Sequence, residues 1–219
     1  MKFLIDTSKK KLKTLMPRPL VGGQLLTPLT QYGNAGEVFA IDNGAFSGFN
    51  EKRFRSMLEA NAEKMGKCLF VVCPDIVGDS RRTMELWRRR HRWIKEGSGW
   101  QPAFVAQDGC EDMDIPWDEM GALFIGGMDP WKDSKCVVDL VKTAKTLGKH
   151  VHIGRVNTAS RYLAFAKIGA DTCDGSGIAK YDHMLKDIEA AVSAPEQPDL
   201  FDDGLAGNLS ILAHRRANG

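Results

Sequence analysis

Three aspartates end short apolar runs of the sequence, where their carboxylates could take part in chemistry. Asp42 ends the run VFAID, Asp75 ends CLFVVCPD and Asp174 ends ADTCD. One carboxylate can act as a nucleophile while a second moves protons, so a pair of carboxylates in one cavity suits catalysis. Taken singly, each aspartate could instead be a turn residue or a helix cap, because Asp favours both positions.

The other apolar runs also end in polar residues or glycines. Gln107 follows AFVA, Gly126 and Gly127 follow LFI, and Arg155 and Asn157 follow VHIG. Amide, guanidinium and backbone N–H groups are donors that bind polar or anionic ligands. Each set alone could be an ordinary turn, but six runs that end in the same way favour a shared site.

The apolar runs have the length and composition of buried strands. They are rich in Val, Ile and Phe and are fully apolar rather than alternating, which suits strands covered on both faces. The segment MKFLID could supply a first strand, and an eighth could lie within 18–30. The six clearest runs are 38–42, 68–75, 103–107, 122–127, 150–156 and 170–174.

Segments of helical character separate these runs. Apolar residues recur three and four apart in them, and Asp79, Gly148 and Thr158 stand where a cap or a stop is needed. The expected helices cover 51–65, 79–94, 133–147, 158–168 and 182–192.

Strands that alternate with helices pair in parallel through crossover units. Seven or eight strands favour a compact (β/α) TIM-type barrel, complete or slightly degenerate, over an open doubly wound sheet; the 219 residues are near the lower limit for it. The carboxyl ends of all barrel strands share one face, which holds the active site. We expect residues 1–192 to form the catalytic barrel and 193–219 a tail that is flexible or packs back on it.

The composition is that of a soluble globular protein, with 43% hydrophobic and 26% charged residues. No apolar stretch reaches the length of a membrane span, and the N-terminus lacks the pattern of a secretory signal. The five cysteines are odd in number and form no CxxC, so a reducing cytoplasm fits better than a disulfide framework.

No metal or cofactor is expected from the sequence. His150 and His152 alternate on a predicted strand and so share one face, but no acidic or Cys companion is evident beside them. The chain has no pattern with the spacing of a zinc site and no phosphate-cradling glycine loop.

Basic residues are concentrated in one helical segment, although the net charge is only +2. Between Arg81 and Lys95 the single acidic residue is Glu85. Such a stripe can bind a polyanion, but on charge alone a solvated helix face is the simpler explanation. The residues we single out as candidate nucleic-acid contacts are Arg88, Arg89 and Arg92.

Taken in order, these motifs resemble those of the queuine tRNA-ribosyltransferase (tRNA-guanine transglycosylase) superfamily. They look most like its shorter branch, the 7-deazaguanine DNA transglycosylases of phages and bacterial modification clusters. The resemblance covers roughly residues 38–180 and rests on short ordered motifs. Residues 41–46, Ile-Asp-Asn-Gly-Ala-Phe, stand in place of the family's Asp-Ser-Gly-Gly-Phe element, and residues 169–174 match its last strand. The strand-end aspartate, glutamine and Gly-Gly pair match Asp75, Gln107, Gly126 and Gly127.

The resemblance implies a role for each matched residue. Asp174 would attack C1′ of the target nucleotide, and Asp42 would take a proton from the incoming base. A retaining reaction at a sugar carbon uses two carboxylates in this way. Guanine offers N1–H and N2–H₂ donors that suit a carboxylate, and its O6 suits an amide or a backbone N–H. The base-binding set would be Asp75, Gln107, Gly126, Gly127, Asn43 and Phe46. We group Arg155 and Asn157 as nucleic-acid contacts; Arg155 could contact a phosphate, orient a carboxylate or form a structural ion pair.

The expected function is exchange of guanine in DNA for a 7-deazaguanine base of the preQ0 type. The chain lacks the Cys-x-Cys-x-x-Cys…His zinc motif of the tRNA enzymes, which favours DNA over tRNA as the partner. The target base must leave the stack to reach such a pocket. The alternatives are the same exchange on tRNA and a barrel N-glycoside hydrolase acting on nucleosides. A helper protein or a homodimer is compatible with the sequence, and a phage-encoded copy would work in the host cytoplasm.

Overall fold

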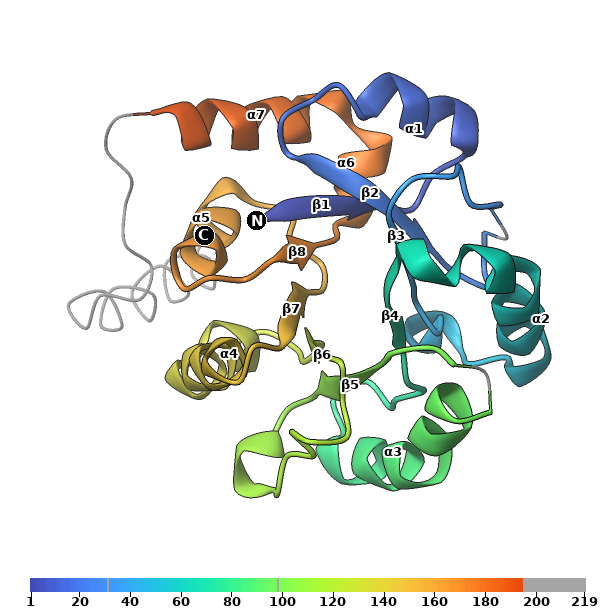
Figure 1. Ribbon diagram of the computed structural model, residues 1–219. Helices are drawn as coiled ribbons and strands as arrows, with labels where there is room; N and C mark the ends of the chain where they lie inside the picture. The colour runs from blue at the N-terminus through green and yellow to red at the C-terminus, as the bar shows by residue number, and fades with distance from the viewer. Residues whose placement is uncertain (31, 98, 195–219) are drawn as a thin grey trace.

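The computed structural model describes residues 1–194 except Gln31 and Ser98. The expected tail, 193–219, lies outside the described residues apart from its first two. The described chain forms a closed barrel of eight parallel strands in sequence order, surrounded by helices (Figure 1). This confirms the predicted barrel and shows it to be complete. The strands are β1 (Lys2–Ile5), β2 (Val21–Leu26), β3 (Phe39–Ile41), β4 (Cys68–Val72), β5 (Pro102–Ala106), β6 (Ala122–Ile125), β7 (His150–Ile153) and β8 (Thr172–Cys173).

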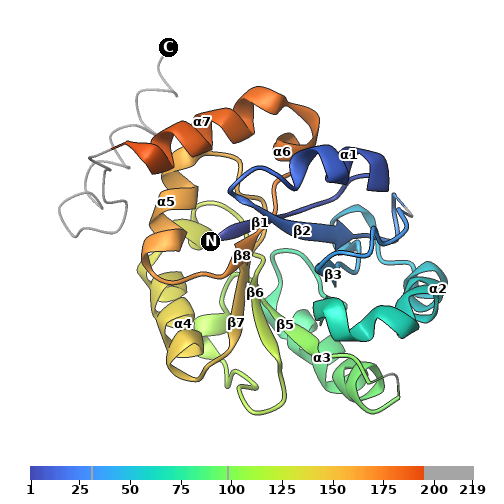
Figure 2. The same cartoon turned by 45° about the horizontal axis from the view of Figure 1, so that its top comes forward.

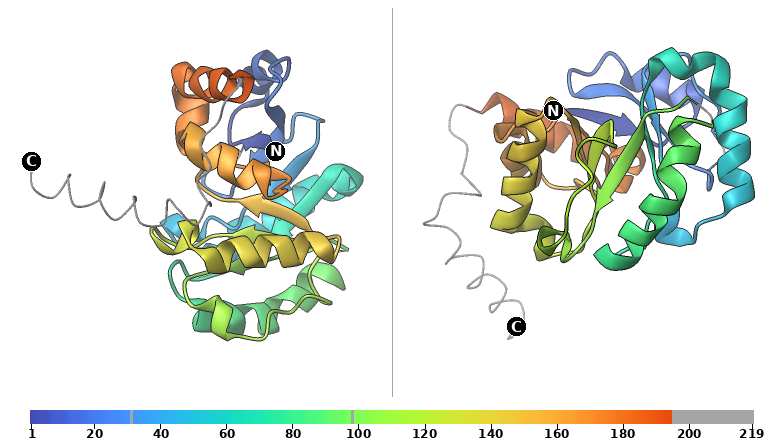
Figure 3. Two further views of the ribbon diagram at one scale, coloured as in Figure 1. Left: turned by 90° about the vertical axis from the view of Figure 1, so that its left-hand side faces the viewer. Right: turned by 60° about the horizontal axis from the view of Figure 1, so that its bottom comes forward.

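Helices follow the strands and cover the outside of the barrel (Figures 2 and 3). The α-helices are α1 (Lys9–Leu15), α2 (Glu51–Asn61), α3 (Ser80–Lys95), α4 (Lys135–Thr146), α5 (Ala159–Lys167), α6 (Ser176–Lys180) and α7 (Asp182–Ser193). Short 3-10 turns are η1 (Ala45–Ser47), η2 (Ala62–Lys67), η3 (Cys110–Asp112) and η4 (Trp131–Asp133). Within the described residues, no helix is both long and apolar enough to cross a membrane.

Side-chain caps fix where several helices begin. Asp79 accepts a hydrogen bond from Arg82 N at 3.0 Å, and Thr158 caps α5 in the same way, as the sequence predicted. The Asn50 side chain caps α2 by accepting a hydrogen bond from Arg53 N. Each cap satisfies a backbone N–H group that the first helical turn leaves without a partner. The caps therefore set the points at which the chain leaves the barrel rim.

Two apolar clusters divide the interior of the molecule. Successive side chains of a strand point to opposite faces, so one set packs under the helices and the other points into the barrel. Val71 and Phe104 belong to the larger cluster, which includes helix residues. Phe70, Val72 and Val105 belong to the smaller cluster, which strand residues alone supply. This inner cluster forms the floor beneath the carboxyl ends of the strands.

The seam that closes the barrel is short. β8 has two residues, and they pair with β1 through Lys2–Thr172 and Phe3–Cys173. α7 lies beside α1 in both Figure 1 and Figure 2. Arg18, just after α1, reinforces this side through ion pairs at 2.9 Å to Asp182 and 2.5 Å to Glu189.

Candidate active site

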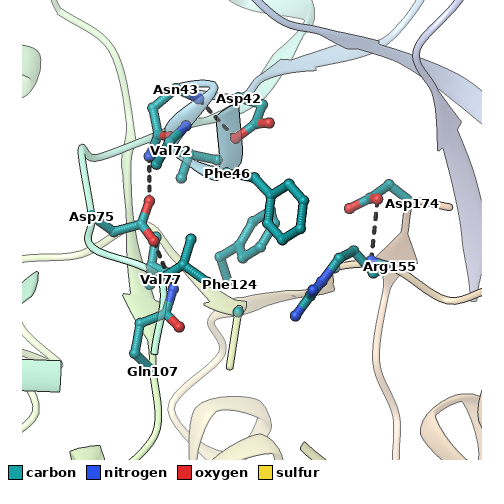
Figure 4. A pocket seen from close by; sticks show the side chains of 14 residues that line it. Asp42, Asn43, Phe46, Val72, Asp75, Val77, Gln107, Phe124, Arg155 and Asp174 are labelled. Atoms are coloured by element: carbon teal, nitrogen blue, oxygen red, sulfur yellow. Dashed lines mark hydrogen bonds between the residues drawn. The ribbon is translucent and has the colours of Figure 1, made fainter. Parts of the chain in front are cut away.

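A cavity of about 100 Å³ opens at the carboxyl ends of the strands. Its walls come from most of the barrel, because β3, β4, β5, β6, β7 and β8 are each followed by a residue that lines it. Figure 4 shows the carboxylates of Asp75 and Asp174 on opposite sides of this cavity, with Asp42 on a third side. The lining residues include Asp42, Asn43, Phe46, Asp75, Gln107, Gly126, Arg155 and Asp174.

The Asp75 carboxylate is held by two amides. Asn43 Nδ2 donates to Asp75 Oδ1 at 2.7 Å, and Gln107 Nε2 donates to Oδ2 at 2.6 Å. Burial raises the pKa of Asp75, while these two hydrogen bonds favour its charged form. Each carboxylate oxygen retains a lone pair for one further donor. The arrangement presents a fixed acceptor edge to the cavity.

Gln107 also ties two loops together. Its Oε1 accepts from the backbone N–H groups of Gly78 and Gly127, both at 2.9 Å. Gly127 has φ 48°, and a side-chain carbon there would lie 2.1 Å from the Trp131 ring. Gly126 is equally restricted, since a side-chain carbon would lie 2.6 Å from Gln107 Nε2. The Gly127 N–H, expected to face a base, is therefore engaged with Gln107, and its role in base binding stays a prediction.

Asp174 is oriented by groups from β7 and the loop after it. Arg155 N donates to Asp174 Oδ1 at 3.1 Å, and His152 Nε2 lies 3.0 Å from Oδ2. The His152 side chain is fully buried, whereas 18% of the Asp174 side chain is exposed. The imidazole thus holds one face of the carboxylate and leaves the other toward the cavity.

A chain of hydrogen bonds continues behind His152. Its Nδ1 lies 2.9 Å from Thr172 Oγ1, which lies 2.8 Å from His150 Nε2. Burial lowers the pKa of His150, so its ring is neutral near pH 7. Donors and acceptors can then alternate from the His150 ring through Thr172 and His152 to Asp174. The two histidines, which lacked a companion in the sequence, therefore have one in Asp174.

Asp42 is the carboxylate whose protonation is most perturbed. Burial, together with the negative charges of Asp174 and Asp75, raises its pKa to about 7. Asn43 N donates to Asp42 Oδ1 at 2.8 Å, which partly opposes the shift. A carboxyl group with a pKa near the working pH can both give and take a proton. Asp42 is thereby suited to proton transfer, while Asp174 is held as an acceptor.

Arg155 and Phe46 form one rim of the cavity. The Arg155 guanidinium lies 5.1 Å from the centre of the Phe46 ring and donates to the Gly127 carbonyl. Phe46 is 68% exposed, and Arg155 has φ 60°. Backbone in the left-handed region is unfavourable for a residue with a long side chain, and such strain is concentrated at functional sites. This aromatic–cation pair is placed to cover a ligand in the cavity.

The remaining predicted nucleic-acid contacts lie outside the cavity lining. Asn157 Oδ1 accepts from Gly177 N at 3.2 Å and so shapes the start of α6. Arg88, Arg89 and Arg92 are exposed on the second half of α3. At 1.5 Å per residue they are about 12 to 18 Å along the helix from its start at the rim. Their contact with nucleic acid stays a prediction, and it requires a ligand that extends around this flank.

Two charged residues near the site were not singled out from the sequence. Lys132 is fully buried, and its Nζ donates to the Gly154 carbonyl at 2.7 Å. Burial and the nearby Arg155 lower the pKa of Lys132 to about 8. Asp6, directly after β1, is half-buried, and burial together with Asp174 raises its pKa. In the described part of the chain, no three His, Cys, Asp or Glu side chains are grouped as a metal site.

Neither the family models nor the curated proteins compared with this chain gave a match. The interpretation of the site therefore depends on its geometry and on the motifs of the sequence.

Proposed function

We propose that the protein exchanges guanine in DNA for a 7-deazaguanine base through a covalent aspartyl-glycosyl intermediate. The observation that carries this proposal is the set of three carboxylates around one cavity, each in a different environment. Asp174 is held by His152 and Arg155, Asp75 by two amides, and Asp42 has a pKa of about 7. Carboxylates that differ in this way can divide the roles of nucleophile, base-binding group and proton carrier.

In the first half-reaction, an Asp174 oxygen attacks C1′ of the target nucleotide and the C1′–N9 bond breaks. The departing guanine takes up a proton at N9 from neutral Asp42, which becomes a carboxylate. In the second half-reaction, the incoming 7-deazaguanine gives its N9 proton to Asp42, attacks C1′ and releases Asp174. Protons and bonds balance over the cycle, as in a retaining glycosyl transfer.

Asp75 suits the Watson–Crick edge of the base in this proposal. Its free lone pairs accept from N1–H and N2–H₂, because the two amides occupy only one lone pair on each oxygen. The second hydrogen of Gln107 Nε2 is the donor available for O6. Phe46 and Arg155 cover the base plane, since both an aromatic ring and a guanidinium stack on flat ring systems.

The cavity is small, so the target nucleotide must be single-stranded or flipped out of a duplex to enter it. We propose DNA as the strand and keep tRNA as the alternative. A nucleoside hydrolase would use the same covalent intermediate and transfer it to water, releasing free sugar rather than exchanged nucleic acid.

The decisive assay follows radiolabelled guanine and a preQ0-type base into DNA and into tRNA, with nucleoside mass spectrometry of the products. Label entering DNA supports the proposal, and label entering tRNA alone changes the strand. Release of free base without incorporation would refute base exchange in favour of hydrolysis. Asp174→Asn is the matched control, because it keeps the size of the side chain and removes the nucleophile.

A further inference from the structure

A second and larger cavity lies on the other side of the loop that carries Asp42. It has a volume of about 660 Å³ and lies between the β2–β3 connection and α2. We name it the basic groove. Its lining includes Lys9, Pro28, Tyr32, Asn34, Asn50, Lys52, Arg53 and Lys64.

The charge of the basic groove has one sign. Lys9, Lys52, Arg53 and Lys64 line it, and no Asp or Glu is among the lining residues. None of these four cations forms an ion pair with a carboxylate of the described residues. Clustered cations without internal partners attract a polyanion, and phosphate groups are the common case.

A buried amide in the groove wall lacks a partner. Asn34 is 3% exposed, and its Oδ1 accepts from Gly36 N at 2.6 Å. Its Nδ2 has no hydrogen-bond partner in the described structure. Buried polar groups are nearly always paired, and this nitrogen has almost no accessible surface, so it could meet a ligand oxygen only after the groove wall moves.

The groove also presents an aromatic side chain. Tyr32 is 37% exposed and lines the cavity. An exposed aromatic ring among cations is the combination that binds single-stranded nucleic acid, because bases stack on the ring while cations follow the backbone. An acidic peptide would also use the cations, but stacking of a flat base on the ring is a contact that only a nucleotide adds. The observations therefore favour a nucleotide strand.

One loop joins the groove to the candidate active site. Residues 42–50 supply Asp42 and Phe46 to the smaller cavity and Asn50 to the groove. Pro28 of the groove packs on this loop, since a side-chain carbon at Gly44 would lie 3.6 Å from Pro28 Cδ. A strand bound in the groove thus lies one loop away from the place where a flipped nucleotide would enter.

We propose that the basic groove binds one or two nucleotides next to the nucleotide whose base is exchanged, holding them single-stranded. This inference rests on the proposed function. Lys52 and Arg53 contact phosphates at the start of α2, and Tyr32 stacks on a base. The groove therefore acts as the positioning site for the strand and makes no contact with the reacting sugar.

The test measures the affinity of a short fluorescein-labelled single-stranded oligodeoxynucleotide by fluorescence anisotropy between about 50 and 200 mM salt. The groove variant is Lys52→Ala/Arg53→Ala. The matched control is Lys142→Ala/Lys167→Ala, which removes the same charge from exposed positions in the last turns of α4 and α5, far from the rim. We expect the slope of log K against log salt to fall by about 1.4 in the groove variant, or about 0.7 for each phosphate that is no longer neutralised, and to stay unchanged in the control.

Tyr32 separates stacking from charge. Tyr32→Ala should weaken binding by about fivefold or more with no change in the salt slope, and Tyr32→Phe should restore the affinity. Parallel arms with duplex DNA and an RNA stem-loop identify the kind of strand that the groove prefers.

The outcomes distinguish this inference from the proposed function. Base exchange by the wild type together with an unchanged slope in the groove variant overturns the groove alone. Absence of base exchange, with the groove variant still showing a reduced slope, overturns the proposed function and leaves a nucleic-acid groove. A wild-type protein that binds none of the strands overturns both.

Discussion

Replacement of Asp42 with Asn should stabilise the fold at neutral and alkaline pH. The pKa of Asp42 is raised from an ordinary 3.8 to about 7 in the folded protein, chiefly by burial. Between these values the folded chain holds a proton that the unfolded chain has released, so stability falls as the pH rises from about 4 to about 7. Asn has the same shape, keeps an oxygen to accept the Asn43 N–H, and does not titrate.

The magnitude follows from the size of the pKa shift. A shift of about three units, at about 1.36 kcal/mol per unit, gives an upper limit of about 4 kcal/mol above pH 7. About 2 to 3 kcal/mol of this loss falls between pH 5 and pH 8. For a domain of this size, 1 kcal/mol changes Tm by roughly 2 to 4 °C. The Tm advantage of Asp42→Asn should therefore grow by about 5 to 10 °C from pH 5 to pH 8.

Thermal unfolding followed by circular dichroism at the two pH values measures this difference. Asp112→Asn is the control, because Asp112 is exposed on η3 and its replacement should shift Tm equally at both pH values. The same Asp42→Asn protein should lose base exchange. A Tm difference between Asp42→Asn and the wild type that is the same at pH 5 and pH 8 would refute our account of this carboxyl group.

Three further predictions concern the site and its surroundings. Asp174→Ala should lower base exchange by at least about four orders of magnitude, and Asp174→Asn should form no covalent adduct with DNA. Full exchange activity in either variant would refute the mechanism. His152→Ala should lower kcat about ten- to a hundredfold, because the Asp174 carboxylate loses one hydrogen bond. KM should change little, and the pH profile of the reaction should change. An unchanged pH profile would indicate that the imidazole has a purely structural role. Replacing Arg88, Arg89 and Arg92 with Ala should weaken DNA binding and reduce its salt slope by about 0.9 for each duplex phosphate that the variant no longer neutralises, whereas an unchanged slope would show these residues to be a solvated helix face.

The fold was accessible from the sequence because each strand is a nearly continuous apolar run. The predicted segments 68–75 and 122–127 contain β4 and β6, and the eighth strand was found where it was expected, at Val21–Leu26. The sequence did not reveal α1, because Leu12 and Leu15 are its only buried residues and its lysines obscure the helical period. Nor did it reveal α6, which has only five residues.

The cavity-lining positions were accessible for the same reason, since the ends of parallel strands must meet. The hydrogen-bond partners of those residues could not be predicted from the sequence. His152 reaches Asp174 because β7 pairs with β8 in a register that places His152 beside Thr172, and no local pattern reveals a register. The identity of a residue does not fix the direction of its side-chain amide. The hydrogen bonds of Gln107 with Asp75 and with Gly127 could therefore not be foreseen. The basic groove collects Lys9, Tyr32 and Lys64 from separate segments and has no signature along the chain.

The short seam between β1 and β8 determines when the chemistry becomes possible during folding. Its partners are separated by roughly 170 residues, the longest loop that this chain has to close, and such pairings form late. A nascent or half-folded chain can already bring Asp42 and Asp75 together, because they follow neighbouring strands. Only docking of the last strand places Asp174 opposite them. Under the proposed function, an incomplete chain lacks its nucleophile and cannot open a glycosidic bond.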